Sequence, residues 1–322
     1  MDAGDTFFSS AVLASQNADG DKLQAKGLLQ GYEKIGCDAL NVGGFDIAAG
    51  KDFLMSLAHG SSIPFISANL TDSNDNLLFP SHIIIENNGF KIGVTGFSNL
   101  IPAHVNDVNK RPYVEAINKV ISDIESQVDF VVLLANIERK KVNSLAEKFP
   151  DADYIFISRD TQRTRPAVKQ VDGGPYLYSS GVQSKYVTVV NISLNDVRQP
   201  IIDISTAKGK ISSITQRIER LQKKDPDRTI EELYADKPNV LKLVSDYRQQ
   251  LVKYETIMAD AINTTQYESI PLSNVVGEDA ELLAFVDETL ATCSALRKKN
   301  IKASKNIIKP KSGPLKKKIS IN

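Results

Sequence analysis

The periodicity of apolar residues changes near residue 205, and this change constrains the fold more than any other feature of the sequence. Before it, apolar runs of strand length alternate with amphipathic stretches of helix length, as in layered α/β domains. After it, apolar residues recur every three or four positions, as in helices that pack along one seam. The sequence therefore predicts an α/β domain over residues 1–204 and a helical hairpin or appendage over residues 205–300.

The first segment shows a regular order of helix and strand signals. Helices are predicted over residues 27–36, 114–126 and 142–149, and strands over residues 38–42, 63–70, 128–134 and 154–157. Between two further strand-like runs, Asn87, Asn88 and Gly89 favour a β-hairpin, because Asn and Gly accept positive φ angles. Residues 176–180 and 186–194 are predicted to pair as an antiparallel edge.

The second segment carries a heptad pattern. One apolar face consists of Ile211, Ile214, Ile218 and Leu221, and a second consists of Val240, Val244, Tyr247, Leu251, Tyr254, Met258 and Ala261. Pro238 stands where the second helix would begin, and a third helix is predicted over residues 279–298. The apolar stripe either packs against its partner helix and the α/β domain or binds another protein, and both interpretations stay open.

The net charge is zero overall but is unevenly distributed. The chain has 39 basic and 39 acidic side chains, yet ten basic residues and no acidic residue follow Glu288. The remaining 29 basic and 39 acidic residues give the body a net charge of −10. The Lys-rich end, which contains Pro310, Gly313 and Pro314, predicts a basic flexible tail over residues 301–322. Such a tail either stays solvated or binds nucleic acid, anionic lipid or an acidic partner. The rest of the chain is not expected to bind nucleic acid.

Cysteine, histidine and hydropathy patterns exclude several kinds of protein. Cys37 and Cys293 are too few for a disulfide framework or a four-thiolate zinc site. His59, His82 and His104 share no metal-binding spacing, so each is interpreted as a surface or turn residue. No apolar run approaches the roughly 20 residues of a membrane span, and no signal peptide is visible at the start.

Six stretches, in order, resemble one known domain. They are DAGDTFF, GYEKIGCDALNVGGFDIAAG, IPFISANLTD, NGFKIGVTGFSN, VDFVVLLAN and DADYIFISRDT. Together they are similar to the metallophosphoesterase domain of the 5′-nucleotidase family, within the calcineurin-like phosphoesterase superfamily, across residues 2–194. The resemblance implies an αββα sandwich, here lacking its first strand because the family's "DxH" motif has no counterpart. It also implies two divalent metals, phosphoester hydrolysis in nucleotide catabolism, and a periplasmic or extracellular origin.

The resemblance assigns each family ligand to a position in this chain. The metal-bridging aspartate corresponds to Asp5, and the histidine that ends the next core strand corresponds to Asn136, a weak neutral ligand. The two histidines of the "GHxH" motif correspond to Arg159 and Thr161. Of the residues that bind metal in the family, the resemblance therefore assigns vestigial counterparts here at Asp5 and Asn136.

The catalytic motif "GNHE" is replaced entirely. Its asparagine corresponds to Val42, its catalytic histidine to Gly43 and its glutamate to Gly44, so these positions are vestigial and no catalytic residue is assigned. No metal cofactor is expected here, although the family uses two.

Arg159 puts a permanent positive charge where the family places imidazoles around cations. One hypothesis is that Arg159 pairs with Asp5 and fills the vacated site, because a buried carboxylate without its metals is costly. The alternative is that Arg159 faces solvent in a basic loop with Arg163 and Arg165, where the three could bind an anion.

Three functions follow from this pattern. The first is a family member that has lost dimetal hydrolysis and serves as a scaffold or binding protein, with a protein partner at the helical segment. The second is an active phosphoesterase with a rearranged site, with ligands drawn from Asp2, Asp5, Asp46, Asn136 or Asp160. The third is a non-catalytic nucleotide or anion binder. The family's nucleoside-binding domain has no counterpart after residue 205, and the oligomeric state is not predicted.

Overall fold

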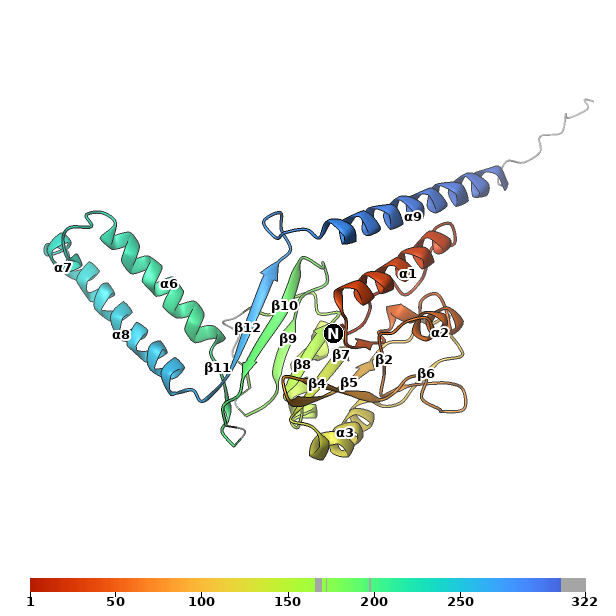
Figure 1. The fold of residues 1–322 in the computed structure, drawn as a ribbon, viewed down its shortest axis with the longest axis horizontal. Helices are drawn as coiled ribbons and strands as arrows, with labels where there is room; N and C mark the ends of the chain where they lie inside the picture. Colours follow the sequence, from red (N-terminus) through yellow and green to blue (C-terminus); the bar gives the residue numbers. More distant parts are fainter. Residues whose placement is uncertain (166–169, 172, 197, 308–322) are drawn as a thin grey trace, which may run out of the picture. The chain divides into compact units, whose positions relative to one another are not determined.

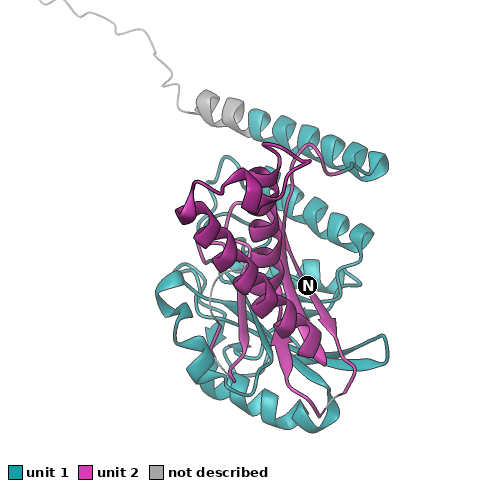
Figure 2. Cartoon of the chain, turned by 90° about the vertical axis from the view of Figure 1, so that its left-hand side faces the viewer, with its two compact units in different colours: residues 1–159, 277–322 teal, residues 160–276 magenta. Residues whose placement is uncertain are grey.

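The computed structural model of the 322-residue chain describes residues 1–165, 170–171, 173–196 and 198–307. These residues form two compact units (Figure 2). Unit 1 comprises Met1–Arg159 together with the chain from Gly277 onward, and unit 2 is Asp160–Val276. This division differs from the predicted boundaries at residues 204 and 300, because the chain leaves unit 1 earlier and its last helix returns to it.

The main sheet of unit 1 forms the centre of that unit. Its strands, in spatial order, are β4 (His82–Asn87), β5 (Phe90–Ser98), β7 (Phe130–Asn136) and β8 (Tyr154–Ser158). The β4–β5 pair is antiparallel, and its turn has positive φ at Asn88 and Gly89, which confirms the predicted hairpin. The β5, β7 and β8 strands are parallel and bring Ser98, Asn136 and Ser158 to one edge of the sheet.

Apolar burial explains why β7 is the central strand. All seven residues of β7 are buried. Helix α3 (Tyr113–Ile124) lies against β5 and buries Ile117, Val120, Ile121 and Ile124. The helix predicted over residues 142–149 is instead two short helices, α4 (Arg139–Val142) and α5 (Leu145–Lys148). The hydroxyl of Ser144 donates to the carbonyl of Lys141 at 2.9 Å, a local bond that competes with continuous helix.

Short strands form the second half of unit 1. Strand β1 (Leu40–Asn41) pairs in parallel with β2 (Phe65–Ile66), and Asp2 bridges Leu40 on the other side. The predicted strands at residues 38–42 and 63–70 are thus present but shorter. The remaining elements here are η1 (Phe45–Ile47), α2 (Lys51–His59), β3 (Leu70–Thr71), β6 (Asn109–Lys110) and η2 (Glu125–Gln127). The bridge at Asp2 fixes the N-terminal residues beside β1.

Two helices distant in sequence lie side by side in unit 1 (Figure 1). Helix α1 (Ala18–Ile35) ends at the left-handed Gly36, as predicted, and packs against α9 (Ala280–Ile307). Arg297 of α9 donates to Asp21 at 2.7 Å and to Gln24 at 2.7 Å. Helix α9 includes residues 301–307, and the rest of the predicted basic tail lies outside the described residues.

Unit 2 contains a sheet that the sequence did not predict correctly. Strand β10 (Tyr186–Ser193) pairs along its length with β12 (Asn263–Pro271), and β12 pairs in parallel with β11 (Ile201–Asp203). The prediction that residues 186–194 pair with β9 (Tyr176–Ser179) is therefore wrong, and β12 interrupts the segment predicted as helical. The buried positions of β12 include Asn263 and Thr265, so its alternation carries little apolar signal.

The heptad helices of unit 2 are present. Helices α6 (Ser205–Gln222) and α8 (Pro238–Asp260) pack on each other, and Pro238 lies in the first turn as predicted. Between them, α7 (Ile230–Leu233) begins with a capping box formed by Thr229 and Glu232. Within the residues that the model describes, none of the helices combines the length and hydropathy that a bilayer crossing requires.

The contacts of Arg297 predict that it anchors α9 to α1. We expect Arg297→Ala to increase amide hydrogen exchange and tryptic cleavage in α9, because two charge-assisted contacts to Asp21 and Gln24 are lost. Lys298→Ala is the matched control, since Lys298 is exposed on the same helix. Equal protection of α9 in the two variants would contradict this role.

Candidate functional site

Asp5 lies in a backbone turn that brings it against β1 and its following loop. Gly4 and Asp5 both have positive φ, and the carboxylate of Asp2 supports the turn by accepting bonds from Gly4 N and Thr6 Oγ1. Such a conformation is unusual for a residue with a side chain, although Asp tolerates it better than most. The Asp5 side chain, with 10% relative exposure, points into unit 1.

The carboxylate of Asp5 has a backbone hydrogen-bond donor and a counter-charge. Its Oδ1 accepts a hydrogen bond of 2.7 Å from the backbone N–H of Phe45, and its Oδ2 lies 3.2 Å from Nε of Arg159. Burial raises the pKa of Asp5, while the Phe45 N–H, the Asn136 amide and Arg159 act in the opposite direction. The predicted ion pair between Arg159 and Asp5 is therefore confirmed.

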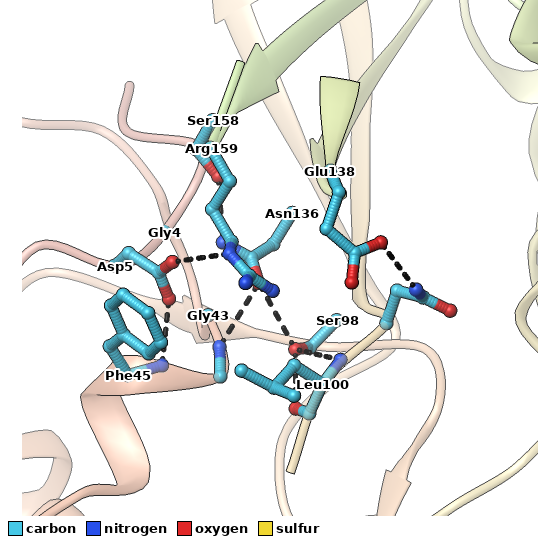
Figure 3. A network of polar contacts seen from close by, with 12 residues as sticks. Gly4, Asp5, Gly43, Phe45, Ser98, Leu100, Asn136, Glu138, Ser158 and Arg159 are labelled. Atoms are coloured by element: carbon cyan, nitrogen blue, oxygen red, sulfur yellow. Dashed lines mark hydrogen bonds and ion pairs between the residues drawn. The ribbon is translucent and has the colours of Figure 1, made fainter. Parts of the chain in front are cut away.

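Arg159 is held by more than the ion pair. It directly follows β8 in a left-handed conformation and is 17% exposed. Its guanidinium lies over the ring of Phe45, with 4.9 Å between the guanidinium carbon and the ring centroid. Figure 3 shows the guanidinium among Asp5, Phe45 and Asn136. The alternative that Arg159 faces solvent is wrong.

Asn136 joins several elements at the edge of the sheet. Its Oδ1 accepts a bond from the Gly44 N–H at 3.1 Å. It also accepts a bond from the Ser98 hydroxyl at 3.2 Å (Figure 3). Its Nδ2 donates to the hydroxyl of Ser158 at 2.8 Å, and that hydroxyl donates to the carbonyl of Ala3. The carbonyl oxygen that would ligate a metal is thus already engaged by two donors.

Asp46 is the structural centre of the turn that replaces the catalytic motif. Its carboxylate accepts three backbone N–H bonds, from Asp5 and Gly43 at Oδ2 and from Phe7 at Oδ1. Complete burial, and secondarily the charge of Asp5, raise the pKa of Asp46 to about 8 against the opposing effect of these donors. Asp46 therefore holds residues 5–7 against the loop after β1.

The three vestigial positions of the catalytic motif are closed by backbone packing. Val42 is fully buried in the core. A Cβ atom on Gly43 would lie 2.2 Å from the Asp5 nitrogen and 2.5 Å from Asp5 Oδ1. A Cβ atom on Gly44 would lie 2.7 Å from Cβ of Leu100. The Asp5 backbone and carboxylate occupy the space that a side chain at Gly43 would need, and Leu100 occupies the space at Gly44.

The other two arginines of the predicted basic loop belong to unit 2. Arg163 stacks on the ring of Tyr186 at 4.0 Å and donates to the hydroxyl of Ser269 at 2.7 Å. Arg165 is exposed. Asp160, also in unit 2, is buried and accepts the N–H of Gln162. Arg163 is therefore engaged within its own unit, so the expectation of a three-arginine solvent-facing loop is not met.

The donor set does not fit a two-metal centre. Within the described residues, no group of three or more His, Cys, Asp or Glu side chains is arranged to hold a metal ion. His59 is exposed at the end of α2, and His82 lies in β4 beside Ser81. His104 contacts the carbonyl of Ala48 at 3.1 Å. Protein groups already engage the oxygens of Asp5, Asp46 and Asn136, so these three residues do not form the ligand set that a two-metal mechanism needs.

Three residues of the site were not identified from the sequence. Phe45 supplies the ring under Arg159, and Ser98 and Ser158 bond the two ends of the Asn136 amide. Ser98 and Ser158 end the two strands that flank β7. The carboxyl ends of neighbouring parallel strands lie at the same edge of a sheet. The strand order alone could therefore have predicted that both serines lie next to Asn136.

Comparison with solved structures identifies the fold. The crystal structure of calcineurin-like phosphoesterase YfkN from Bacillus subtilis matches with a TM-score of 0.57 and 16% identity, covering 92% of this chain and 84% of that chain. The sulfate thiohydrolase SoxB of Thermus thermophilus matches with a TM-score of 0.50 and 18% identity, covering 60% of this chain and 35% of that chain. A 5′-nucleotidase precursor from Thermus thermophilus gives a TM-score of 0.46 at 16% identity, covering 60% and 41%.

The chain is therefore structurally similar to a calcineurin-like phosphoesterase, the superfamily to which its sequence resemblance pointed. It is a mixed α/β protein with a metallophosphoesterase-like fold. No protein-family model matches the sequence, and no curated protein matches it. At identities of 16 to 18% the similarity concerns the fold alone, and this chain spans about a third of the SoxB chain.

The close approach at Gly43 gives a stability prediction. We expect Gly43→Ala to lower the free energy of unfolding by about 1–3 kcal/mol, because the new methyl group must displace the Asp5 backbone. Gly31→Ala is the matched control: it lies in α1 with nothing within 4 Å of its Cβ position and should stabilise by about 1 kcal/mol. Urea denaturation of both variants checks this, and equal effects would contradict the packing argument.

Removing Arg159 should destabilise unit 1. We expect Arg159→Ala to cost about 3 kcal/mol, because the largely buried Asp5 carboxylate loses its counter-charge. Arg165→Ala should change stability by less than about 0.5 kcal/mol, since Arg165 is exposed. Thermal and urea denaturation measure both changes, and a neutral Arg159→Ala variant would show that the pair is dispensable.

The raised pKa of Asp46 predicts that stability falls as the pH rises from about 4 to about 8. In this window the native state keeps the Asp46 proton, while the unfolded chain has released it above its usual pKa of about 4. The unfolded state therefore binds fewer protons, and raising the pH favours it. Asp46→Asn, which does not titrate, should flatten this slope in urea denaturation. A slope unchanged by the substitution would contradict the assignment.

Proposed function

We propose that this chain is a metallophosphoesterase-like protein that has lost dimetal phosphoester hydrolysis and serves as a scaffold or binding protein. In this proposal, unit 1 corresponds to the αββα sandwich of the 5′-nucleotidase type. The strand order β4–β5–β7–β8 and the parallel β1–β2 pair are consistent with two sheets of such a sandwich.

The observation that carries the proposal is the ion pair of Arg159 with Asp5. A guanidinium 3.2 Å from the carboxylate supplies the positive charge that a metal ion would otherwise supply to Asp5. Arg cannot lose its proton at physiological pH, so this charge is permanent. A divalent metal at Asp5 would either displace Arg159 or place its positive charge beside that of the guanidinium.

The lack of room at Gly43 supports the same conclusion. General acid–base catalysis requires a titratable side chain within hydrogen-bonding distance of the reacting group. Gly43 and Gly44 provide none, and a side chain at Gly43 would meet the Asp5 backbone. Hydrolysis at a rearranged site would therefore need both metal ligands and an acid that these positions do not supply.

A binding role is favoured by the helical part of unit 2. Helix α8 has 23 residues, yet only Val244 among them is buried. Large apolar side chains remain exposed on this helix, at Leu243, Val252 and Ile257. At about 100° per residue, Leu243 and Ile257 lie on one side of the helix and Val252 on the other. A pair of exposed apolar side chains on one side of a helix can contact another protein. Arg163, by contrast, is engaged with Tyr186 and Ser269, so anion binding by the basic loop receives no support.

Two solution measurements test the proposal. The purified chain is incubated with Mn²⁺, Zn²⁺ or Mg²⁺, its bound metal is quantified, and turnover is measured with bis-p-nitrophenyl phosphate and AMP. We expect substoichiometric metal and no turnover above buffer. Turnover that is abolished by Asp5→Asn, but not by the exposed control Asp52→Asn, would overturn the proposal in favour of an active phosphoesterase.

A further inference from the structure

We propose that one side of the α6–α8 hairpin binds an amphipathic α-helix of another protein, one that has a row of carboxylates beside its apolar seam. This inference names the kind of partner for the binding role proposed above and rests on that role. It is tested at surface residues of unit 2, so it can fail while the loss of hydrolysis in unit 1 stands, and the reverse also holds.

The two helices that form this surface run antiparallel and pack on each other (Figure 1). Ile218 and Leu221 of α6 pack against the small core that contains Val244 of α8, so these sides of the helices face each other. Beside this core, the guanidinium carbon of Arg217 lies 5.7 Å from the ring centroid of Tyr247, and Arg217 donates to the Tyr247 hydroxyl at 3.3 Å. Arg217 and Tyr247 therefore lie on the same side of the hairpin, here called the Arg217 side.

Helix α6 contributes positive charge to the Arg217 side. At about 100° per residue, Lys210, Arg217 and Arg220 lie within a strip about 80° wide. All three side chains are exposed. Glu219, the one acidic residue of α6, lies on another side of the helix. The Tyr247 hydroxyl that Arg217 contacts is uncharged, so this side of α6 offers three cations and no anion.

Helix α8 contributes an apolar seam to the same side, because Tyr247 belongs to that seam. Its members recur every three or four residues: Leu243, Tyr247, Gln250, Tyr254 and Ile257. Leu243 is 44% exposed and Ile257 is 37% exposed, and both tyrosines are half-buried. These positions form a strip about 21 Å long and about 80° wide, within which α8 has no charged residue. The spacing is that of a coiled-coil seam, which a further helix can cover.

Charge and spacing together select the partner. A helix laid along the seam of α8 would turn one of its edges towards α6, where Lys210, Arg217 and Arg220 lie. Carboxylates at that edge would form ion pairs with the three cations, as the charged residues beside the seam do in coiled coils. The partner is therefore an acidic amphipathic helix, which binds by the helix-in-groove mode of recognition.

Other occupants fit this surface less well. A second copy of the chain, placed by two-fold symmetry, would set the cations of the two α6 helices against each other without a carboxylate between them. Nucleic acid or anionic lipid would meet the cations, but neither has the helical spacing that the seam of α8 presents.

Binding of a defined peptide to the full chain tests the inference. The probe is a fluorescein-labelled helical peptide of about 21 residues, with Leu at the a and d positions of each heptad and Glu at the e and g positions, whose glutamates oppose its self-association. Fluorescence anisotropy should show saturable binding that weakens as NaCl is raised from about 50 mM to about 300 mM. The same peptide with Lys in place of Glu should not bind.

Matched charge variants locate the site. Lys210→Glu/Arg220→Glu should weaken peptide binding by about tenfold or more, because two ion pairs become repulsive contacts. Lys242→Glu/Lys253→Glu makes the same charge change at exposed positions on another side of α8 and should leave binding within about twofold of the wild type. Circular dichroism checks that the helices remain. Lys210→Gln/Arg220→Gln, which removes the charges without reversing them, should weaken binding in the same direction.

Apolar variants test the seam separately. Leu243→Gln should weaken peptide binding, whereas Val252→Gln, at an exposed position on the other side of α8, should not. No saturable binding by the wild-type chain, or equal weakening by the Arg217-side variants and their controls, would overturn the proposal. Tighter binding of a labelled single-stranded oligonucleotide or of phosphatidylserine-containing vesicles, lost in Lys210→Glu/Arg220→Glu, would also overturn it, in favour of a nucleic-acid or membrane surface.

Discussion

The largely buried carboxylate of Asp5 is the constraint around which unit 1 is built. It sits in a left-handed turn, with one oxygen on the Phe45 N–H and the other beside Arg159. An ionised carboxylate removed from water is strongly unfavourable unless hydrogen bonds and an opposite charge compensate it. The ring of Phe45 covers the guanidinium, so the pair is shielded on that side as well. The neighbouring hydrogen bonds fix the two residues in this relation.

Backbone packing and polar bonding around the pair depend on each other. Asp46 binds the nitrogens of Asp5, Phe7 and Gly43, and Asn136 binds Gly44 and Ser158. These contacts connect the N-terminal turn, the loop after β1 and the ends of the parallel strands. Because glycine occupies position 43, the loop can approach Asp5 closely enough for this network to form. A phosphoesterase-like fold thus holds a polar core of protein groups at the edge of its parallel strands.

Much of unit 1 could be predicted from sequence, because its signals are local. The Asn88–Gly89 turn needs positive φ, and the sequence of the fully buried β7 is an almost continuous apolar run. The pairing of Arg159 with Asp5 could be inferred once both were assigned to the same strand-end site. The role of Gly43 could not be predicted, because a close approach between two backbone segments leaves no pattern in a single sequence.

Unit 2 and α9 were predicted less well, for identifiable reasons. The buried face of β12 carries Asn263, Thr265 and Tyr267, so hydrophobic alternation does not reveal it. Arg163 was grouped with Arg159 by charge, yet Tyr186 and Ser269 hold it within unit 2. The return of α9 to α1 depends on a contact between Asp21 and Arg297, which are 276 positions apart, and periodicity reports only neighbours on one helix.

We propose that Arg159 supplies to Asp5 the positive charge that a metal ion would otherwise supply. This proposal is tested most directly by anomalous diffraction from a crystal of the chain soaked in Mn²⁺. We expect no anomalous peak at Asp5, with Nε of Arg159 remaining close to the 3.2 Å that separates it from the carboxylate. A manganese peak on the Asp5 carboxylate, with the Arg159 side chain displaced from it, would contradict the account.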